Sequence, residues 1–145
     1  LGIAFNDVTR LDQFHMSNTE IGSALHSFSQ STDWQGKPFS PKFKQGVIGF
    51  SIDEFIRKFS PQFPTHIKID VDGIENKIVE GGRETIADSR LKSMLVELDE
   101  NQPELTRPVI TAIEQAGLKL SVKKHASMFD NSEFASVYNH IFYRP

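Results

Sequence analysis

Five charged side chains around one short stretch are the residues of this chain best suited to chemistry. Four lie within residues 67 to 75, and the fifth lies in the next apolar stretch of the sequence. They are Lys68, Asp70, Asp72, Glu75 and Glu97. Carboxylates accept hydrogen bonds, hold cations or act as general bases. The stretch therefore predicts a catalytic or binding site in which these five residues are the candidates.

The candidate acids follow the clearest predicted strand of the chain. Apolar residues alternate with polar ones over residues 67 to 71, and Gly73 then allows a sharp turn into a predicted short helix. Ligands of open α/β sheets bind outside the carboxyl ends of the strands, so we expect Asp70 at the rim of a pocket. Asp72 and Glu75 have two equally good explanations, as ligand-binding groups or as solvated acids at a helix start.

Lys68 is unusual for a strand inside a parallel sheet, which is normally apolar on both faces. A buried ammonium group requires a partner. Glu97 breaks the apolar pattern of the next predicted strand, residues 94 to 98. We therefore predict a contact between Lys68 and Glu97 across adjacent strands. A purely structural ion pair explains this contact as well as a functional one does.

The elements that must position these residues alternate along the chain. Strands are predicted at residues 1–5, 11–16, 47–50, 67–71, 94–98, 118–122 and 141–143. Helices are predicted from residue 51, where Ser51 and Glu54 form a capping box, and at 74–79, 83–87 and 109–116, with Gly117 as the last C-cap. This order predicts an α/β fold with a mostly parallel sheet and an antiparallel edge pair. Residues 17–46 show no clean period and are predicted to be an insertion or lid loop.

Composition narrows the class of protein. The chain has 145 residues, 38% of them hydrophobic, with a net charge of −3 and no cysteine. These values suit one globular domain and leave no basic footprint for nucleic acid, no disulfide and no thiolate metal site. No apolar run approaches the length of a membrane span, and no targeting segment is visible, so we expect a cytoplasmic protein. The start at Leu1 suggests part of a longer protein.

Residues 67–75, followed by Gly81, resemble the hallmark of FkbM-type methyltransferases, in which a strand ends in Lys-Ile-Asp-Val-(Glu/Asp)-Gly-x-Glu before a helix and a glycine. Four other segments resemble further parts of that family: residues 49–55, 94–98, 116–118 and 139–143. The resemblance is good over about residues 45 to 145 and looser before them.

The resemblance implies the carboxyl-terminal portion of one class I, Rossmann-like methyltransferase domain across residues 1–145. The amino-terminal, cofactor-binding half would be absent, and the fragment alone is expected to be inactive. The implied reaction is methylation of a hydroxyl on a sugar, glycan or natural product by S-adenosylmethionine. Asp70 would act as the base or orient the acceptor, with Lys68 and Glu97 as orienting groups. Asp70, Asp72 and Glu75 would lie on the cofactor side, and no metal is carried over.

Two other assignments stay open at this point. Asp70, Asp72 and Gly73 fit the motif of haloacid-dehalogenase-like magnesium phosphatases, although Ile74 stands where threonine is usual. A non-catalytic binding module is the second. The five histidines show no paired metal spacing. A bare sheet edge would also allow the chain to form a homo-oligomer.

Overall fold

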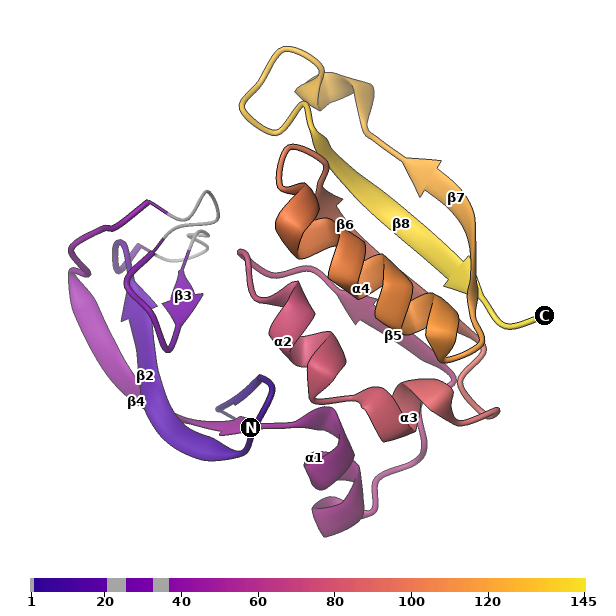
Figure 1. The fold of residues 1–145 in the computed structure, drawn as a ribbon. Coiled ribbons are helices and arrows are strands. Elements are labelled where there is room, and N and C mark those ends of the chain that lie inside the picture. The colour runs from indigo at the N-terminus through magenta and orange to yellow at the C-terminus, as the bar shows by residue number, and fades with distance from the viewer. Residues whose placement is uncertain (1, 21–25, 33–36) are drawn as a thin grey trace.

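The computed structural model describes residues 2–20, 26–32 and 37–145. Over these residues the fold is mixed α/β, as predicted, with two four-stranded sheets (Figure 1). The strand order is β1-β4-β2-β3 in the first sheet and β5-β6-β8-β7 in the second. The first sheet stands to one side of the helices, and the second lies behind them (Figure 1).

The first sheet is built mainly from one antiparallel hairpin. Its strands are β1 (Ile3–Phe5), β2 (Arg10–Met16), β3 (Ser27–Phe28) and β4 (Phe43–Phe50). β2 is antiparallel to β3 and β4, whereas β1 is parallel to β4. β4 starts four residues before the prediction because its ladder with β2 begins at Phe43. The predicted loop at 17–46 thus contributes β3 and the start of β4, and its residues 21–25 and 33–36 lie outside the described residues.

The second sheet carries the candidate acids. Its strands are β5 (His66–Ile69), β6 (Ser93–Asp99), β7 (Lys119–Lys124) and β8 (Val137–Tyr143). β5 and β6 are parallel, and β8 lies between β6 and β7, antiparallel to both. The predicted antiparallel edge pair is confirmed, but the prediction of a mostly parallel sheet is wrong. The chain returns from β7 so that β8 takes the position beside β6, which prevents a parallel β6–β7 ladder.

The helices begin and end largely where their caps predict. They are α1 (Ile52–Phe59), α2 (Glu75–Glu80), α3 (Arg83–Ala87), α4 (Pro103–Gln115) and a short 3-10 turn at Ser127–Phe129. The Ser51 hydroxyl accepts a hydrogen bond from the Glu54 N–H at 3.2 Å. Gly117 has a φ of +93°, as a C-terminal cap requires. None of the helices in the described residues has the length and apolarity needed to cross a membrane.

The fourth helix starts earlier than the sequence pattern predicts. It begins at Pro103 rather than at Val109, and Pro108 lies inside it. Proline is tolerated in the first turn of a helix, where the missing N–H would have no intrahelical partner, and Pro103 occupies this position. Pro108 lies past the first turn, where it removes one backbone donor from the helix. The Thr106 hydroxyl also donates a hydrogen bond to the Asp99 carbonyl at 2.8 Å, which ties this first turn to the end of β6.

Helices cover one face of the second sheet, and the side chains on that face are therefore buried. α2 and α4 both contact β6 and lie in front of the sheet in Figure 1. Met94, Val96 and Leu98 of β6 point toward these helices and are almost fully buried. Glu97 alternates with them and is only half-buried. The predicted two-faced character of this strand is confirmed.

Contacts of α1 and α3 join the two sheets. The Asp53 carboxylate of α1 accepts hydrogen bonds from the N–H groups of Glu84 and Thr85 at 2.9 and 2.8 Å, and from the Thr85 hydroxyl at 2.6 Å. Between α2 and α3, Gly81 packs so closely on the backbone of Asn6 that a Cβ atom there would overlap the Asn6 carbonyl. The position of the first sheet therefore depends on a glycine and a capping carboxylate.

Candidate functional site

Asp70 and Glu97 come together at the carboxyl ends of two neighbouring parallel strands. β5 ends at Ile69, which pairs with Val96 of β6, so the residues that follow, Asp70 and Glu97, lie side by side. Their carboxyl groups are close enough to share a hydrogen bond. Parallel pairing thus places two acids side by side at the carboxyl ends of the strands, where ligands of such sheets bind.

Lys68 forms its ion pair with Asp70 rather than with Glu97. The Lys68 Nζ lies 2.7 Å from Asp70 Oδ2, and the two side chains are 62% and 43% exposed. The predicted Lys68–Glu97 contact is therefore wrong in its partner. β5 lies at the edge of its sheet, so Lys68 reaches solvent and pairs with the nearest acid on its own face. Asp70, and to a smaller extent Glu97, raises the pKa of Lys68.

The environment of Glu97 favours a protonated carboxyl group. Burial is the main cause that raises the pKa of Glu97, to about 6, and the neighbouring Asp70 carboxyl adds to it. The positive charge of Lys68 acts in the opposite direction, and the more distant Asp72 raises the pKa slightly. Glu97 thus keeps its proton to a higher pH than an ordinary glutamate does.

Glu75 is the most strongly perturbed of the candidate acids. The pKa of Glu75 is raised to about 7, mainly by burial and in smaller part by the negative charges of Asp72 and Glu97. Gly73, with a φ of +93°, turns the chain so that its N–H donates to Glu75 Oε1 at 3.3 Å, which partly offsets this rise. The explanation of Glu75 as a solvated acid does not hold, because most of its carboxyl group is removed from water.

A sequence signal for the burial of Glu75 exists. Ile78 and Val79 follow it by three and four residues, and both are buried in α2. Residues at this spacing share one face of a helix. Glu75 therefore belongs to the buried face of α2. The interpretation of Glu75 as a solvated acid at a helix start did not take this spacing into account.

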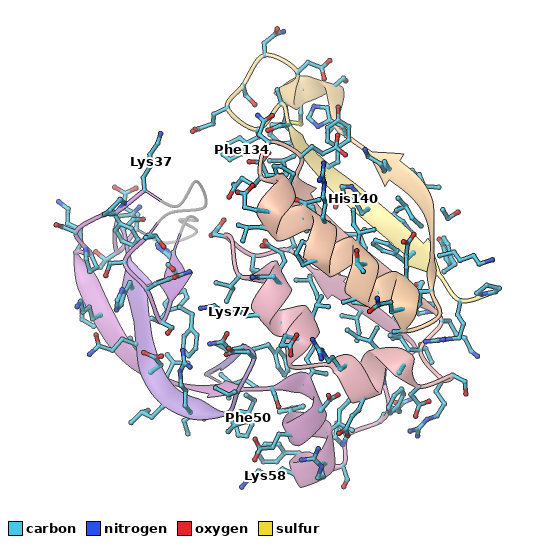
Figure 2. The ribbon with its side chains drawn as sticks, in the orientation of Figure 1. Lys37, Phe50, Lys58, Lys77, Phe134 and His140 are labelled. Carbon is cyan, nitrogen blue, oxygen red and sulfur yellow. The ribbon has the colours of Figure 1, made fainter. Side chains whose placement is uncertain are left out.

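Two hollows meet at the end of β5. The smaller one, a pocket of about 70 Å³, lies between the β5–α2 turn and the start of α4. The polar side chains of its wall are Asp72, Glu75, Asn76, Glu97, Asp99, Gln102 and Thr106. Phe134 closes the pocket beside the first turn of α4 (Figure 2).

The larger hollow is a groove of about 920 Å³ between the two sheets. Lys68, Asp70 and Asp72 line it on the β5 side, and the rest of the wall is largely apolar, with β1 and α1 opposite. Both hollows are lined by Val71 and Asp72. The candidate acids thus stand between a small polar pocket and a large, mostly apolar groove.

A sequence model described as the methyltransferase FkbM domain matches residues 1–120. The chain belongs to the FkbM methyltransferase family. The family resemblance predicted from residues 67–75 is thereby confirmed, and the match includes the first 44 residues, which resembled the family only loosely. Neither the comparison with curated proteins nor that with solved structures gives a match.

Histidine, aspartate and glutamate are the side chains of this FkbM chain that could bind a metal ion. In the described part of the chain, no group of three or more His, Cys, Asp or Glu side chains is placed to hold a metal ion. His140, which could have faced the pocket, is buried on β8, and its Nδ1 lies 3.1 Å from the Tyr138 carbonyl oxygen. It lies behind α4 in Figure 2. Among the described residues, the charged side chains that line the two hollows are carboxylates and one lysine.

Proposed function

We propose that this FkbM chain is the carboxyl-terminal part of an S-adenosylmethionine-dependent O-methyltransferase that acts on a hydroxyl of a sugar, glycan or natural product. One observation carries the proposal. Asp70, Glu75 and Glu97 gather at the carboxyl ends of the parallel strands β5 and β6, where a polar pocket meets a large groove. Membership of the FkbM family supports methyl transfer as the reaction class.

The groove suits the chemistry of the methyl donor. S-adenosylmethionine combines a cationic sulfonium with a flat, largely apolar base. Asp70 and Asp72 would hold the donor through their carboxylates, and the apolar wall of the groove offers a surface for the base. When bound, the donor supplies an electrophilic methyl carbon.

The residues of this chain would position the acceptor and exclude water. A pocket of about 70 Å³ has space for a hydroxyl-bearing carbon, and an acceptor seated there would displace the water from it. The Lys68–Asp70 ion pair fixes the Asp70 carboxylate at the strand end, where it faces the groove that would hold the donor. Holding two reactants in line supplies a large part of the acceleration of a displacement reaction.

Two strand edges support the proposal that the chain is one part of a larger class I sheet. β1 and β5 are both edge strands, and both line the groove. Strands of a cofactor-binding half would satisfy these edges. In a longer protein that includes such a half, we expect amide exchange along His66–Ile69 to be slower than in the 145-residue chain. Equal exchange rates would contradict this arrangement.

Radiolabelled methyl transfer tests the proposed function. The complete gene product would be incubated with methyl-labelled S-adenosylmethionine and a panel of neutral sugars and hydroxylated natural products. We expect label in at least one acceptor. Asp70→Asn should lower kcat/KM by about 100-fold, because a misplaced donor is no longer in line with the acceptor, and the exposed Asp130→Asn serves as the matched control.

Two further measurements separate the alternatives. No heat in calorimetry with S-adenosylhomocysteine would favour the non-catalytic binding module. Hydrolysis of p-nitrophenyl phosphate with magnesium, lost in Asp70→Asn, would favour the phosphatase. The phosphatase requires a free nucleophilic aspartate, and the ion pair of Asp70 with Lys68 disfavours it.

A further inference from the structure

We propose that Glu75, rather than Asp70, is the catalytic base that removes the proton of the acceptor hydroxyl. This inference rests on the proposed methyltransferase function and assigns a role within the same site. In the reaction, the acceptor oxygen forms a bond to the methyl carbon, and the carbon–sulfur bond breaks with its electron pair on sulfur. The hydroxyl proton passes to the carboxylate of Glu75, which later releases it to solvent.

The position of Glu75 suits this role because its carboxylate is held in the small pocket. Oε1 accepts the hydrogen bond of the Gly73 N–H at 3.3 Å, and the positive φ of Gly73 sets the direction of that N–H. Glu75 lies at the start of α2, whose Ile78 and Val79 anchor the same helix face in the core. A base must be fixed within reach of the proton that it accepts, and this arrangement fixes one oxygen of the carboxylate.

Asp70 is less suited to the role of base. Lys68 neutralises its carboxylate at 2.7 Å, and Glu97 shares a hydrogen bond with it. Both interactions engage the Asp70 carboxylate before any acceptor binds. Asp70 also lines the groove and not the small pocket.

The charges that face Glu75 all have the same sign. Asp72 on the β5–α2 turn, together with Glu97 and Asp99 of β6, lines the pocket with it. α4 contributes the neutral Gln102 and Thr106, and among the described lining residues there is no lysine or arginine. Burial, together with the charges of Asp72 and Glu97, raises the pKa of Glu75 to about 7, close to the value at which a general base is most effective at neutral pH.

Steady-state kinetics of the complete gene product test whether Glu75 is the base. The acceptor is the compound that takes up the most methyl label in the assay described above. We expect Glu75→Gln to lower kcat/KM by about 100- to 10,000-fold and to leave the affinity for S-adenosylhomocysteine within about twofold. In the wild type, kcat/KM should rise about tenfold per pH unit up to a pKa near 7 and then level off. This limb should be missing in Glu75→Gln. Glu80→Gln, an exposed acid on the same helix, should retain the wild-type rate and profile.

A second measurement needs no variant and no acceptor. Carbon-13 NMR of the Glu75 carboxyl group in the 145-residue chain should show a titration midpoint near 7. A midpoint near 4.5, or a Glu75→Gln enzyme that keeps the wild-type rate and the pH limb, would overturn the assignment. Failure of the proposed function has a different signature: the wild type would methylate no acceptor and bind no S-adenosylhomocysteine.

Discussion

The ammonium group of Lys68 lies 2.7 Å from the carboxylate of Asp70, two residues further along the same chain segment. This pair is half exposed, because β5 lies at the edge of its sheet. The ion pair holds the Asp70 carboxylate, which follows the end of β5, against a side chain of β5. It also places a positive charge near Glu97, whose pKa it lowers against the larger effect of burial.

Replacing Lys68 should change the titration of Glu97 more than the stability of the fold. We expect Lys68→Met to leave the free energy of unfolding nearly unchanged, as is usual for exposed ion pairs. The pKa of Glu97 should rise above its value of about 6, because the opposing positive charge is lost. NMR titration of the Glu97 carboxyl measures this shift, and Lys58→Met on α1 is the control. An unchanged Glu97 titration would contradict the assigned interaction.

The stability of the chain should fall between pH 5 and pH 8. Burial raises the pKa of Glu75 from 4.5 to about 7, so the folded state binds this proton more tightly than the unfolded state does. The resulting stabilisation is complete below pH 4.5 and is lost as the pH rises through 7. From this shift we expect a loss of roughly 1–3 kcal/mol, with a smaller contribution of the same sign from Glu97.

Urea unfolding at pH 5 and pH 8 measures this dependence. Glu75→Gln cannot ionise at this position, so its stability should change much less between the two pH values, and it should be more stable than the wild type at pH 8. Glu80→Gln, with its acid exposed on the same helix, should follow the wild type. A Glu75→Gln variant with the full wild-type dependence would show that another group is responsible.

Gly81 should tolerate no side chain. A Cβ atom at this position would overlap the backbone carbonyl of Asn6, and backbone cannot move aside as a flexible side chain can. We expect Gly81→Ala to destabilise the fold by about 1–3 kcal/mol or more, as overpacked sites do. Gly46→Ala is the matched control, because nothing lies within 4 Å of its added Cβ. Thermal unfolding of both variants checks the prediction, and equal melting temperatures would refute it.

Arg144 should be a major stabilising residue of the second sheet. Its guanidinium donates hydrogen bonds to the carbonyl oxygens of Leu91, Ala116 and Ile86 at 2.9, 3.0 and 2.6 Å. Hydrogen bonds to charged groups contribute about 1.5–3 kcal/mol each, and three carbonyls would lose their donor together. We expect Arg144→Ala to cost about 2–4 kcal/mol in urea unfolding. Arg107→Ala, on the exposed face of α4, should stay within about 0.5 kcal/mol of the wild type.

Local features of this fold could be predicted because they depend on residues close together in the chain. The capping box at Ser51 and Glu54, the glycine cap at Gly117 and the turn at Gly73 each need only a few neighbouring residues to form. The family followed from one continuous segment, residues 67–75, for the same reason. The alternation in β6 likewise told which of its residues face the core.

Only the tertiary structure decided which residues act on one another. The partner of Lys68 depends on β5 being an edge strand, and the sheet order depends on where β8 inserts. The burial of Glu75 requires the β5–α2 turn, the end of β6 and the first turn of α4 to meet around one pocket. Periodicity within a segment holds no information on these distant pairings, since the free energy of burial comes from surfaces that belong to different segments. The sequence alone therefore identified the protein family, whereas the packing of distant segments determined the pKa values of Glu75 and Glu97.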